Sequence, residues 1–226
     1  MAGAPARSLH VLGVEVPPEA HSLAGFRAWV ASLPDAGPRL RATFCGGGVY
    51  VEDRPQDDDS HAPLVAEVNR VLGNLTVAGE LGMYFAPPSS FTHAKAGVST
   101  EPDGMLVRFE TFRAGRARVN PDQRTELVGT PDLVLEVVSR SSARKDLVDL
   151  VRDYARAGVA EYWIADARAA AAAVDFRVLV LDGRRYEPVA PGRGGWLRSP
   201  TFGRRFRLRR LVNAAGLADY RLDSRP

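Results

Sequence analysis

Apolar residues recur at helical spacing in three segments of the chain. The stripe of the first segment consists of Leu23, Phe26, Val30 and Leu33. The second and third segments cover residues 61–74 and 146–157, and a glycine stands at the end of each, Gly73 and Gly158. The spacing therefore predicts helices over 23–33, 61–74 and 146–157.

Alternating or continuous apolar runs between these segments predict β-strands. The runs RLRATFC and VYVED flank Gly46–Gly48 and predict a hairpin, and a second hairpin is predicted to turn at Asp182-Gly183. Further strands are predicted at LTVAGELGMYFAP, GMLVRFETF, TPDLVLEVVS and VAEYWIAD. This order of elements predicts an α/β or α+β fold with a mixed central sheet flanked by helices, preceded by an N-terminal helix and hairpin.

Length and composition limit the kinds of protein to consider. The 226 residues, 45% of them hydrophobic, can bury one sizeable core, so we expect one domain over 1–226, with an N-terminal extension (1–20) and a C-terminal tail (213–226). The single cysteine, Cys45, excludes an intrachain disulfide and a cysteine-cluster zinc site. We see no signal peptide and no apolar run that could span a bilayer, and therefore expect a cytoplasmic protein without membrane contact.

The basic residues are almost all arginine. Two of the 30 basic residues, Lys95 and Lys145, are lysines, which leaves 28 arginines. Codon usage in a GC-rich genome explains this bias without any function. A mechanism that needs a lysine consequently has two candidates.

Two acids interrupt the apolar run TPDLVLEVVS. In a strand Asp132 and Glu136 share one face, roughly 13 Å apart at about 3.3 Å per residue. That separation is too long for one ion with ligand distances of ~2.0 to 2.6 Å. A companion ligand for Glu136 must come from a neighbouring strand, and Asp103, which precedes the apolar run GMLV, is suitable. Together they could hold Mg²⁺ or Mn²⁺ with a substrate phosphate; alternatively, each acid caps backbone groups or pairs with an arginine.

The segment from Pro131 to Asp166 resembles the bacterial putative restriction endonuclease family with the PD-(D/E)XK nuclease-like fold. The matching residues are Pro131, Asp132, Glu136, Val137, Ser139, Asp146, Tyr154, Gly158, Val159, Glu161, Tyr162, Trp163 and Asp166. The resemblance implies a restriction endonuclease-like core and metal-dependent hydrolysis of DNA. It also implies that Asp103 and Glu136 are the metal ligands, with Asp132 and Glu67 as supporting acids. The expected partner is DNA, and a homodimer is an open option.

The family lysine is missing from this chain. Val138 stands at its usual position, two residues after Glu136, and Leu150 stands at the family's substitute position on the next helix. Lys145 lies about 140° from Leu150 around an α-helix, and Lys95 lies in the loop before Asp103. Each lysine is a catalytic candidate, with a surface charge as the alternative that the spacing favours.

An arginine-rich segment follows in the last quarter of the chain. Between Gly183 and Leu211 there are nine arginines and one acid, Glu187. The residues Arg204, Arg205, Arg207 and Arg209 are candidates for nucleic-acid binding, although an ordinary strand with Phe206 and Leu208 inward has the same pattern. Two functions remain open: a metal-dependent endonuclease, and a catalytically inactive relative that binds nucleic acid or a protein.

Overall fold

The structure is a computed structural model that describes residues 9–12, 14–33, 40–53, 60–168 and 174–226. The acidic run Asp57–Asp59 and the alanine run 169–173, to which the sequence assigns no function, lie outside the described residues. Among the described residues no helix is long and apolar enough to cross a membrane.

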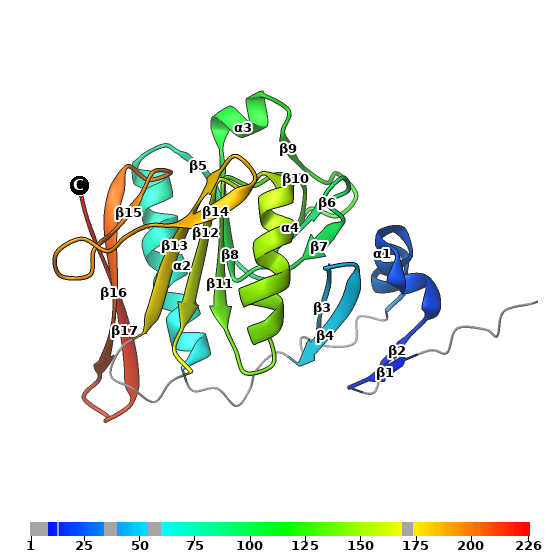
Figure 1. Cartoon of the computed structure of the whole chain (residues 1–226), viewed down its shortest axis with the longest axis horizontal. Coiled ribbons are helices and arrows are strands. Elements are labelled where there is room, and N and C mark those ends of the chain that lie inside the picture. The colour runs from blue at the N-terminus through cyan, green and yellow to red at the C-terminus, as the bar shows by residue number, and fades with distance from the viewer. Residues whose placement is uncertain (1–8, 13, 34–39, 54–59, 169–173) are drawn as a thin grey trace, which may run out of the picture.

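A mixed six-stranded sheet forms the centre of the molecule (Figure 1). Its strand order is β14-β13-β12-β11-β8-β5, in which β11 and β12 are parallel and every other neighbouring pair is antiparallel. The strands are β5 (Gly82–Phe85), β8 (Gly104–Arg108), β11 (Leu133–Val138), β12 (Glu161–Asp166), β13 (Asp175–Asp182) and β14 (Arg185–Pro188). The predicted mixed sheet is confirmed, as is the hairpin turn at Gly183, which has a φ of 60°.

Helices cover both faces of this sheet. On one face α2 (His61–Ala78) buries Leu64, Val68 and Leu72 against Leu133 and Leu135 of β11. On the other face α4 (Leu150–Ala157) packs against Val134, Val138, Tyr162 and Ile164. Side chains of one strand contact both helices because successive side chains of a strand point to opposite faces of the sheet.

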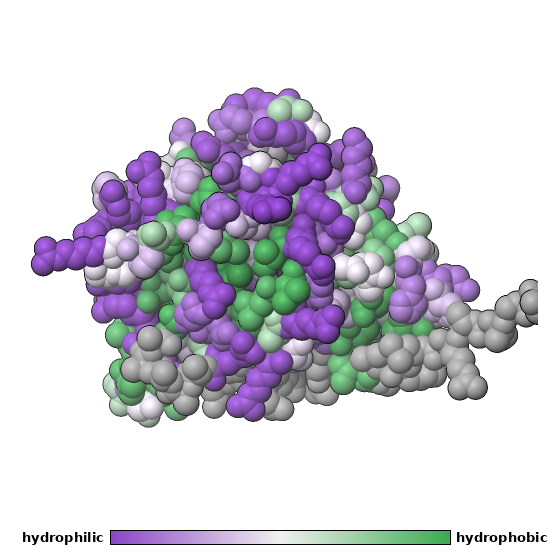
Figure 2. Space-filling view, viewed as in Figure 1, coloured by the Kyte–Doolittle hydropathy of each residue, from purple (hydrophilic) through white to green (hydrophobic). Residues whose placement is uncertain are grey.

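The α4 helix leaves part of its face of the sheet open. Val151 and Leu179 are only partly buried where they pack against the core on this side. Figure 2 shows the corresponding strip of hydrophobic surface beside α4, with hydrophilic side chains around it.

A second six-stranded sheet joins the N-terminal region to the core. Its order is β4-β3-β7-β6-β10-β9, and the helix α1 (Leu23–Ser32) packs on β3. Its strands are β3 (Leu40–Cys45), β4 (Gly48–Asp53), β6 (Ser90–His93), β7 (Val98–Thr100), β9 (Ala117–Val119) and β10 (Glu126–Gly129). The predicted helix and hairpin are both present. The predicted extension also contains structure: β1 (Leu9–Val11), β2 (Val14–Val16) and the 3₁₀ turn η1 (Pro18–His21).

The C-terminal segment 213–226 is not a tail, contrary to the prediction. It contains β17 (Ala218–Arg225), which forms a three-stranded sheet with β15 (Leu197–Ser199) and β16 (Arg204–Val212). One face of this sheet buries Phe206, Leu208, Tyr220 and Leu222 in the same core as α2. The prediction failed because charged residues interrupt the strand sequence ADYRLDSR, and because its pairing with β16 is a tertiary contact.

Two other boundaries differ from the predictions. Helix α2 continues past Gly73 to Ala78, because Leu72 and Thr76 carry its buried face onward, and this packing outweighs a glycine penalty of about 1 kcal/mol. The run GMLVRFETF divides into β8 and a short helix, α3 (Phe109–Arg113). The carboxylate of Asp132 accepts hydrogen bonds from the Arg108 amide and the Thr111 hydroxyl at this junction.

Candidate active site

The two predicted metal ligands lie on neighbouring strands at one end of the central sheet. Leu135 of β11 is paired with Gly104 of β8, so Asp103, directly before β8, follows next in the antiparallel register opposite Glu136. Each residue is 1% exposed. Opposed residues of an antiparallel pair have Cβ atoms about 4.5 to 5.5 Å apart, which brings the two carboxylates to the same end of the sheet.

Cationic and polar donors surround the Asp103 carboxylate. Its Oδ1 accepts a hydrogen bond of 2.9 Å from Arg41, and its Oδ2 accepts one of 2.7 Å from the Val137 amide. The Nε2 atom of His61 lies 3.6 Å from the same Oδ2. Burial by itself raises the pKa of Asp103, but the charges of Arg41 and His61 and the Val137 hydrogen bond hold it well below its usual range. Asp103 is therefore ionised at neutral pH.

Glu136 has a different environment. Its Oε1 accepts a hydrogen bond of 2.6 Å from the Tyr154 hydroxyl, whereas its buried Oε2 has no hydrogen-bond partner among the described residues. Burial raises the pKa of Glu136, and so do the charges of Asp146 and Asp103, while Lys145 and Arg41 act in the opposite direction. An open acceptor on a fully buried acid is costly, and an added cation would relieve this cost.

Lys145 is buried, which contradicts the surface position that helical spacing favoured. Residues Lys145–Asp149 form a π-helical turn, in which the Leu150 amide donates to the Lys145 carbonyl five residues earlier. The wider turn changes the angle between residues, so Lys145 and Leu150 both face inward, at 1% and 0% exposure. An angle calculated for a regular α-helix could not reveal this.

Buried acids hold the ammonium group of Lys145. Its Nζ lies 2.8 Å from Oε2 of Glu52 and 3.2 Å from Oδ1 of Asp146. Burial lowers the pKa of Lys145, but the charges of Asp146, Glu136 and Glu52 outweigh this effect and raise it. Burial raises the pKa of Asp146 to about 6 against the opposing charge of Lys145. Lys145 is therefore a charged group, and its charge opposes the rise in the pKa of Glu136.

Sequence reasoning missed Arg41, Glu52 and His61. Arg41 and Glu52 are cross-strand partners in the β3–β4 hairpin, so Arg41 reaches Asp103 and Glu52 reaches Lys145. We call the largely buried group of Arg41, Glu52, His61, Asp103, Glu136, Lys145 and Asp146 the charged cluster. Strand alternation could have indicated that Arg41 points inward. It shares a face of β3 with Thr43 and Cys45, both of which are buried. The Nε2 of His61, at the start of α2, lies 3.0 Å from the Val137 carbonyl oxygen, and Asp103 raises its pKa despite burial, which lowers it.

The other predicted site residues do not join this cluster. Asp132 lies at the opposite end of β11, where it holds the start of α3. The Glu67 carboxylate accepts a hydrogen bond from the Leu222 amide and pairs with Arg70, so it ties α2 to β17. Lys95 is exposed in the short β6–β7 turn, which does not fold back toward Asp103.

The oxygen donors suit a hard divalent ion. Asp103 and Glu136 provide carboxylate oxygens, and the free Oε2 of Glu136 is an open position for a cation. Within the described ranges no three His, Cys, Asp or Glu side chains gather closely enough to bind a metal ion. Such an ion would thus have few protein ligands, as is usual for Mg²⁺, which keeps several waters and takes substrate phosphate oxygens.

The four candidate arginines of β16 do not share one face. Arg205, Arg207 and Arg209 lie on the outer face, whereas Arg204 alternates with them and lies on the face of Phe206 and Leu208. Asp223 pairs with Arg207, Arg209 and Arg221 of this outer face. The guanidinium groups of Arg207 and Arg225 lie 4.8 and 4.2 Å from the ring centroid of Trp196. We name this outer surface, with Arg205, Arg207, Arg209, Arg221, Arg225 and Trp196, the arginine face.

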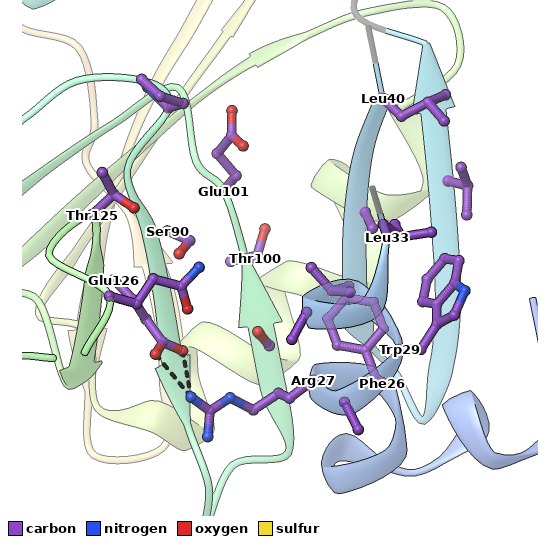
Figure 3. Close-up of a pocket in the computed structure, with 18 of the residues that line it drawn as sticks. Phe26, Arg27, Trp29, Leu33, Leu40, Ser90, Thr100, Glu101, Thr125 and Glu126 are labelled. Atoms are coloured by element: carbon purple, nitrogen blue, oxygen red, sulfur yellow. Dashed lines mark hydrogen bonds and ion pairs between the residues drawn. The ribbon is translucent and has the colours of Figure 1, made fainter. Parts of the chain in front are cut away.

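A cavity of about 450 Å³ lies between α1 and the second sheet, with residues of β3, β6, β7 and β10 in its wall (Figure 3). Arg27 crosses it and binds both carboxylate oxygens of Glu126, at 3.0 and 2.8 Å. Thr92 and Asn120 also donate to Glu126, so this buried acid is fully engaged. The cavity wall includes Glu101, which lies 3.7 Å from Arg41. The ion pair between Arg27 and Glu126 spans this cavity and fastens α1 to the second sheet.

Comparison with solved structures identifies the same fold. A crystal structure of a putative nuclease belonging to DUF820 from Anabaena variabilis ATCC 29413 superposes with a TM-score of 0.57. The alignment covers 80% of this chain and 90% of the other, with 16% sequence identity. At this identity the likeness concerns the fold, and the predicted restriction endonuclease-like core is confirmed. Comparison with curated proteins found no significant sequence match.

Sequence comparison also identifies the family. Residues 27–210 match the family described as Uma2, putative restriction endonuclease. This range contains the hairpin, α2, the central sheet and most of β16, and thus every residue of the charged cluster. The resemblance first noted between Pro131 and Asp166 therefore extends over most of the sequence, and the chain belongs to the Uma2 family of putative restriction endonucleases.

Proposed function

We propose that this protein is a divalent-metal-dependent endonuclease that hydrolyses phosphodiester bonds of DNA at the ends of β8 and β11. The observation that carries the proposal is the register opposition of Asp103 and Glu136, combined with the open Oε2 of Glu136. Membership of a nuclease family agrees with this assignment.

Asp103 and Glu136 would hold the ion, Mg²⁺ or Mn²⁺, which supplies Lewis-acid activation of water and neutralises phosphate charge. The chain's own residues keep these acids in position. Arg41 and the Val137 amide orient Asp103, and the Tyr154 hydroxyl orients Glu136. Lys145, held by Glu52, compensates the buried negative charge near Glu136 and acts as a positioning residue.

Cleavage assays with matched variants test this proposal. Supercoiled plasmid and single-stranded DNA would be incubated with the wild type, Asp103→Asn and Glu136→Gln in Mg²⁺ and in Mn²⁺. Each substitution keeps the side-chain shape and replaces a carboxylate ligand with an amide, so we expect cleavage to fall by at least about 10²-fold. Glu110→Gln is the control, because Glu110 is 61% exposed on α3. Equal cleavage by the wild type and Glu136→Gln would refute the assigned site.

One observation favours a binding function without cleavage. Both oxygens of Asp103 are already engaged by Arg41 and the Val137 amide, so the site is internally neutralised in part. DNA binding by the wild type with no cleavage in either metal ion would identify this second function, with the arginine face as the candidate contact surface. Metal-dependent cleavage that requires Glu136 would exclude it.

A further inference from the structure

The charge that the family lysine usually supplies has to come from another part of this chain. We propose that Arg41 takes this role and that its guanidinium group contacts the phosphate that is cleaved. This inference rests on the proposed nuclease function. It assigns a substrate-contacting residue to a strand, β3, that the nuclease signature around β11 does not include.

Arg41 and Lys145 differ in how exposed their side chains are to solvent. The side chain of Lys145 is 1% exposed and its Nζ is enclosed by Glu52 and Asp146, so a DNA phosphate could not approach it without breaking buried ion pairs. The Arg41 side chain is 14% exposed, and its guanidinium is bonded directly to Asp103. Of these two cations, Arg41 is the one at the boundary between the acids and solvent.

The guanidinium group has the chemistry that a phosphate requires. It carries five N–H donors in a planar fork, of which one nitrogen donates to Asp103 and Nε lies 3.7 Å from Glu101. Such a fork can bind two phosphate oxygens in parallel. Its pKa is raised further by Asp103, Glu136 and Glu101 although burial lowers it, so Arg41 remains charged throughout the reaction.

Packing from both sides fixes Arg41. Arg41 is paired across the hairpin with Glu52, whose carboxylate holds Lys145. On the opposite face of β3, Phe44 packs against Phe26 of α1 with ring centroids 5.7 Å apart. The ion pair between Arg27 and Glu126 anchors α1 in turn. A donor held in this way needs little rearrangement when charge develops, which is the condition for effective electrostatic catalysis.

The proton balance of hydrolysis does not involve Arg41. The oxygen of a water molecule forms a bond to phosphorus while one P–O ester bond breaks. One proton of the water passes to solvent, and the departing oxygen gains a proton from solvent. Arg41 stays protonated and stabilises the negative charge on the non-bridging phosphate oxygens.

The experiment compares Arg41→Ala and Arg41→Lys with the wild type in single-turnover cleavage of a DNA duplex. We expect Arg41→Ala to lower the cleavage rate constant by about 10²- to 10³-fold, with less than about a threefold change in DNA affinity. Arg41→Lys keeps a charge beside Asp103 but removes the fork, so its rate should lie between those of the other two. Arg113→Ala is the control, because Arg113 is 71% exposed on α3.

Folding and function can be separated in this experiment. The melting temperature is measured for every variant, and Arg41→Lys serves as the informative variant if Arg41→Ala is poorly folded. If either Arg41 variant cleaves at a rate close to that of the wild type while Asp103→Asn is inactive, the role of Arg41 is overturned and the proposed function stands. A wild type that does not cleave in Mg²⁺ or Mn²⁺ would instead refute the proposed function.

Discussion

Lys145 and Arg207 lie in two charged regions that differ in burial and in the origin of their partners. Around Lys145 the acids come from β4 and the π-helical turn, and both Lys145 and Asp146 are 1% exposed. On the arginine face, Asp223 is the shared acid for several arginines, and the Arg207 side chain is 35% exposed. The first region joins distant parts of the chain, whereas the second uses neighbouring strands of one sheet.

The difference shows what burial does to charged side chains. A buried ion must be paired, because the removal of its hydration costs several kcal/mol. The removal of one partner therefore affects the whole cluster and the hairpin that is attached to it. Exposed pairs contribute ~0 to 1 kcal/mol each and are screened by salt, so the arginine face can tolerate the replacement of a member without unfolding.

The largest expected effect is that of Lys145→Met on stability. This change leaves Glu52 and Asp146 buried without their cation, and we expect it to lower the free energy of unfolding by about 3 to 5 kcal/mol. Urea denaturation measures the decrease. The control is Arg144→Met, one residue earlier and 83% exposed, with an expected change below about 0.5 kcal/mol. Similar decreases in the free energy of unfolding for the two variants would show that Lys145 does not stabilise the buried acids around it.

The second prediction concerns the pH dependence of the same region. The pKa of Asp146 is raised to about 6 in the folded protein, above the value of 3.8 for a free side chain. As the pH falls from about 7 to about 4, the folded state takes up this proton first, so protonation of Asp146 stabilises the fold by about 1 to 3 kcal/mol. Asp146→Asn removes this titration. Unfolding measured across this pH range should therefore show a flatter profile for the variant, and parallel profiles would contradict the assignment.

The third prediction tests whether the arginine face contacts DNA. Replacing Arg207 and Arg209 with alanine should weaken DNA binding roughly five- to tenfold at physiological salt and reduce the salt slope by about 1 for each phosphate that the protein no longer neutralises. Fluorescence anisotropy over a range of salt concentrations measures both quantities. The matched control replaces Arg113 of α3 and Arg152 of α4, which are 71% and 65% exposed. An unchanged slope in the first variant would exclude this face from binding.

The smallest expected effect is that of Asp223→Asn on stability. Its partners are partly exposed, so the free energy of unfolding should fall by less than about 1 kcal/mol, and about 1 M salt should remove most of the difference. The same change frees the guanidinium groups from their acid, so DNA binding should become tighter. A large decrease in stability would mean that the exposed ion pairs of the arginine face matter for folding as much as the buried pairs around Lys145.

Much of the fold was predictable because its signals are local. The alternation in β11, the stripe of α4 and the glycine at Gly158, with a φ of 79°, follow from short-range geometry. The placement of Asp103 and Glu136 on neighbouring strands was also predictable, since Asp132 and Glu136 lie too far apart along one strand for a single ion. The end of α2 and the strand β17 were missed because packing against the core decides them.

The sequence predicted only part of the candidate site. The family resemblance implied that Glu67 is a supporting acid, but in the structure its carboxylate accepts a hydrogen bond from the Leu222 amide of β17. For Lys145 the spacing favoured a surface charge over a catalytic role, because the angle was calculated for an α-helix, and the π-helical turn invalidates that angle. Arg41 lies 62 residues before Asp103, and Glu52 is similarly remote from Lys145, so no sequence period connects these positions.

The sequence by itself pointed to Asp103 and Glu136 as the acids of two neighbouring strands, because strand alternation and the apolar runs beside them are properties of the local chain. Only the tertiary structure decided which cations meet those acids. The hairpin brings Arg41 to Asp103 and Glu52 to Lys145, and the π-helical turn brings Lys145 inward. The physical reason is that charge pairing in a buried site depends on distances of about 3 Å between elements, and such distances exist only after the sheets and helices have packed.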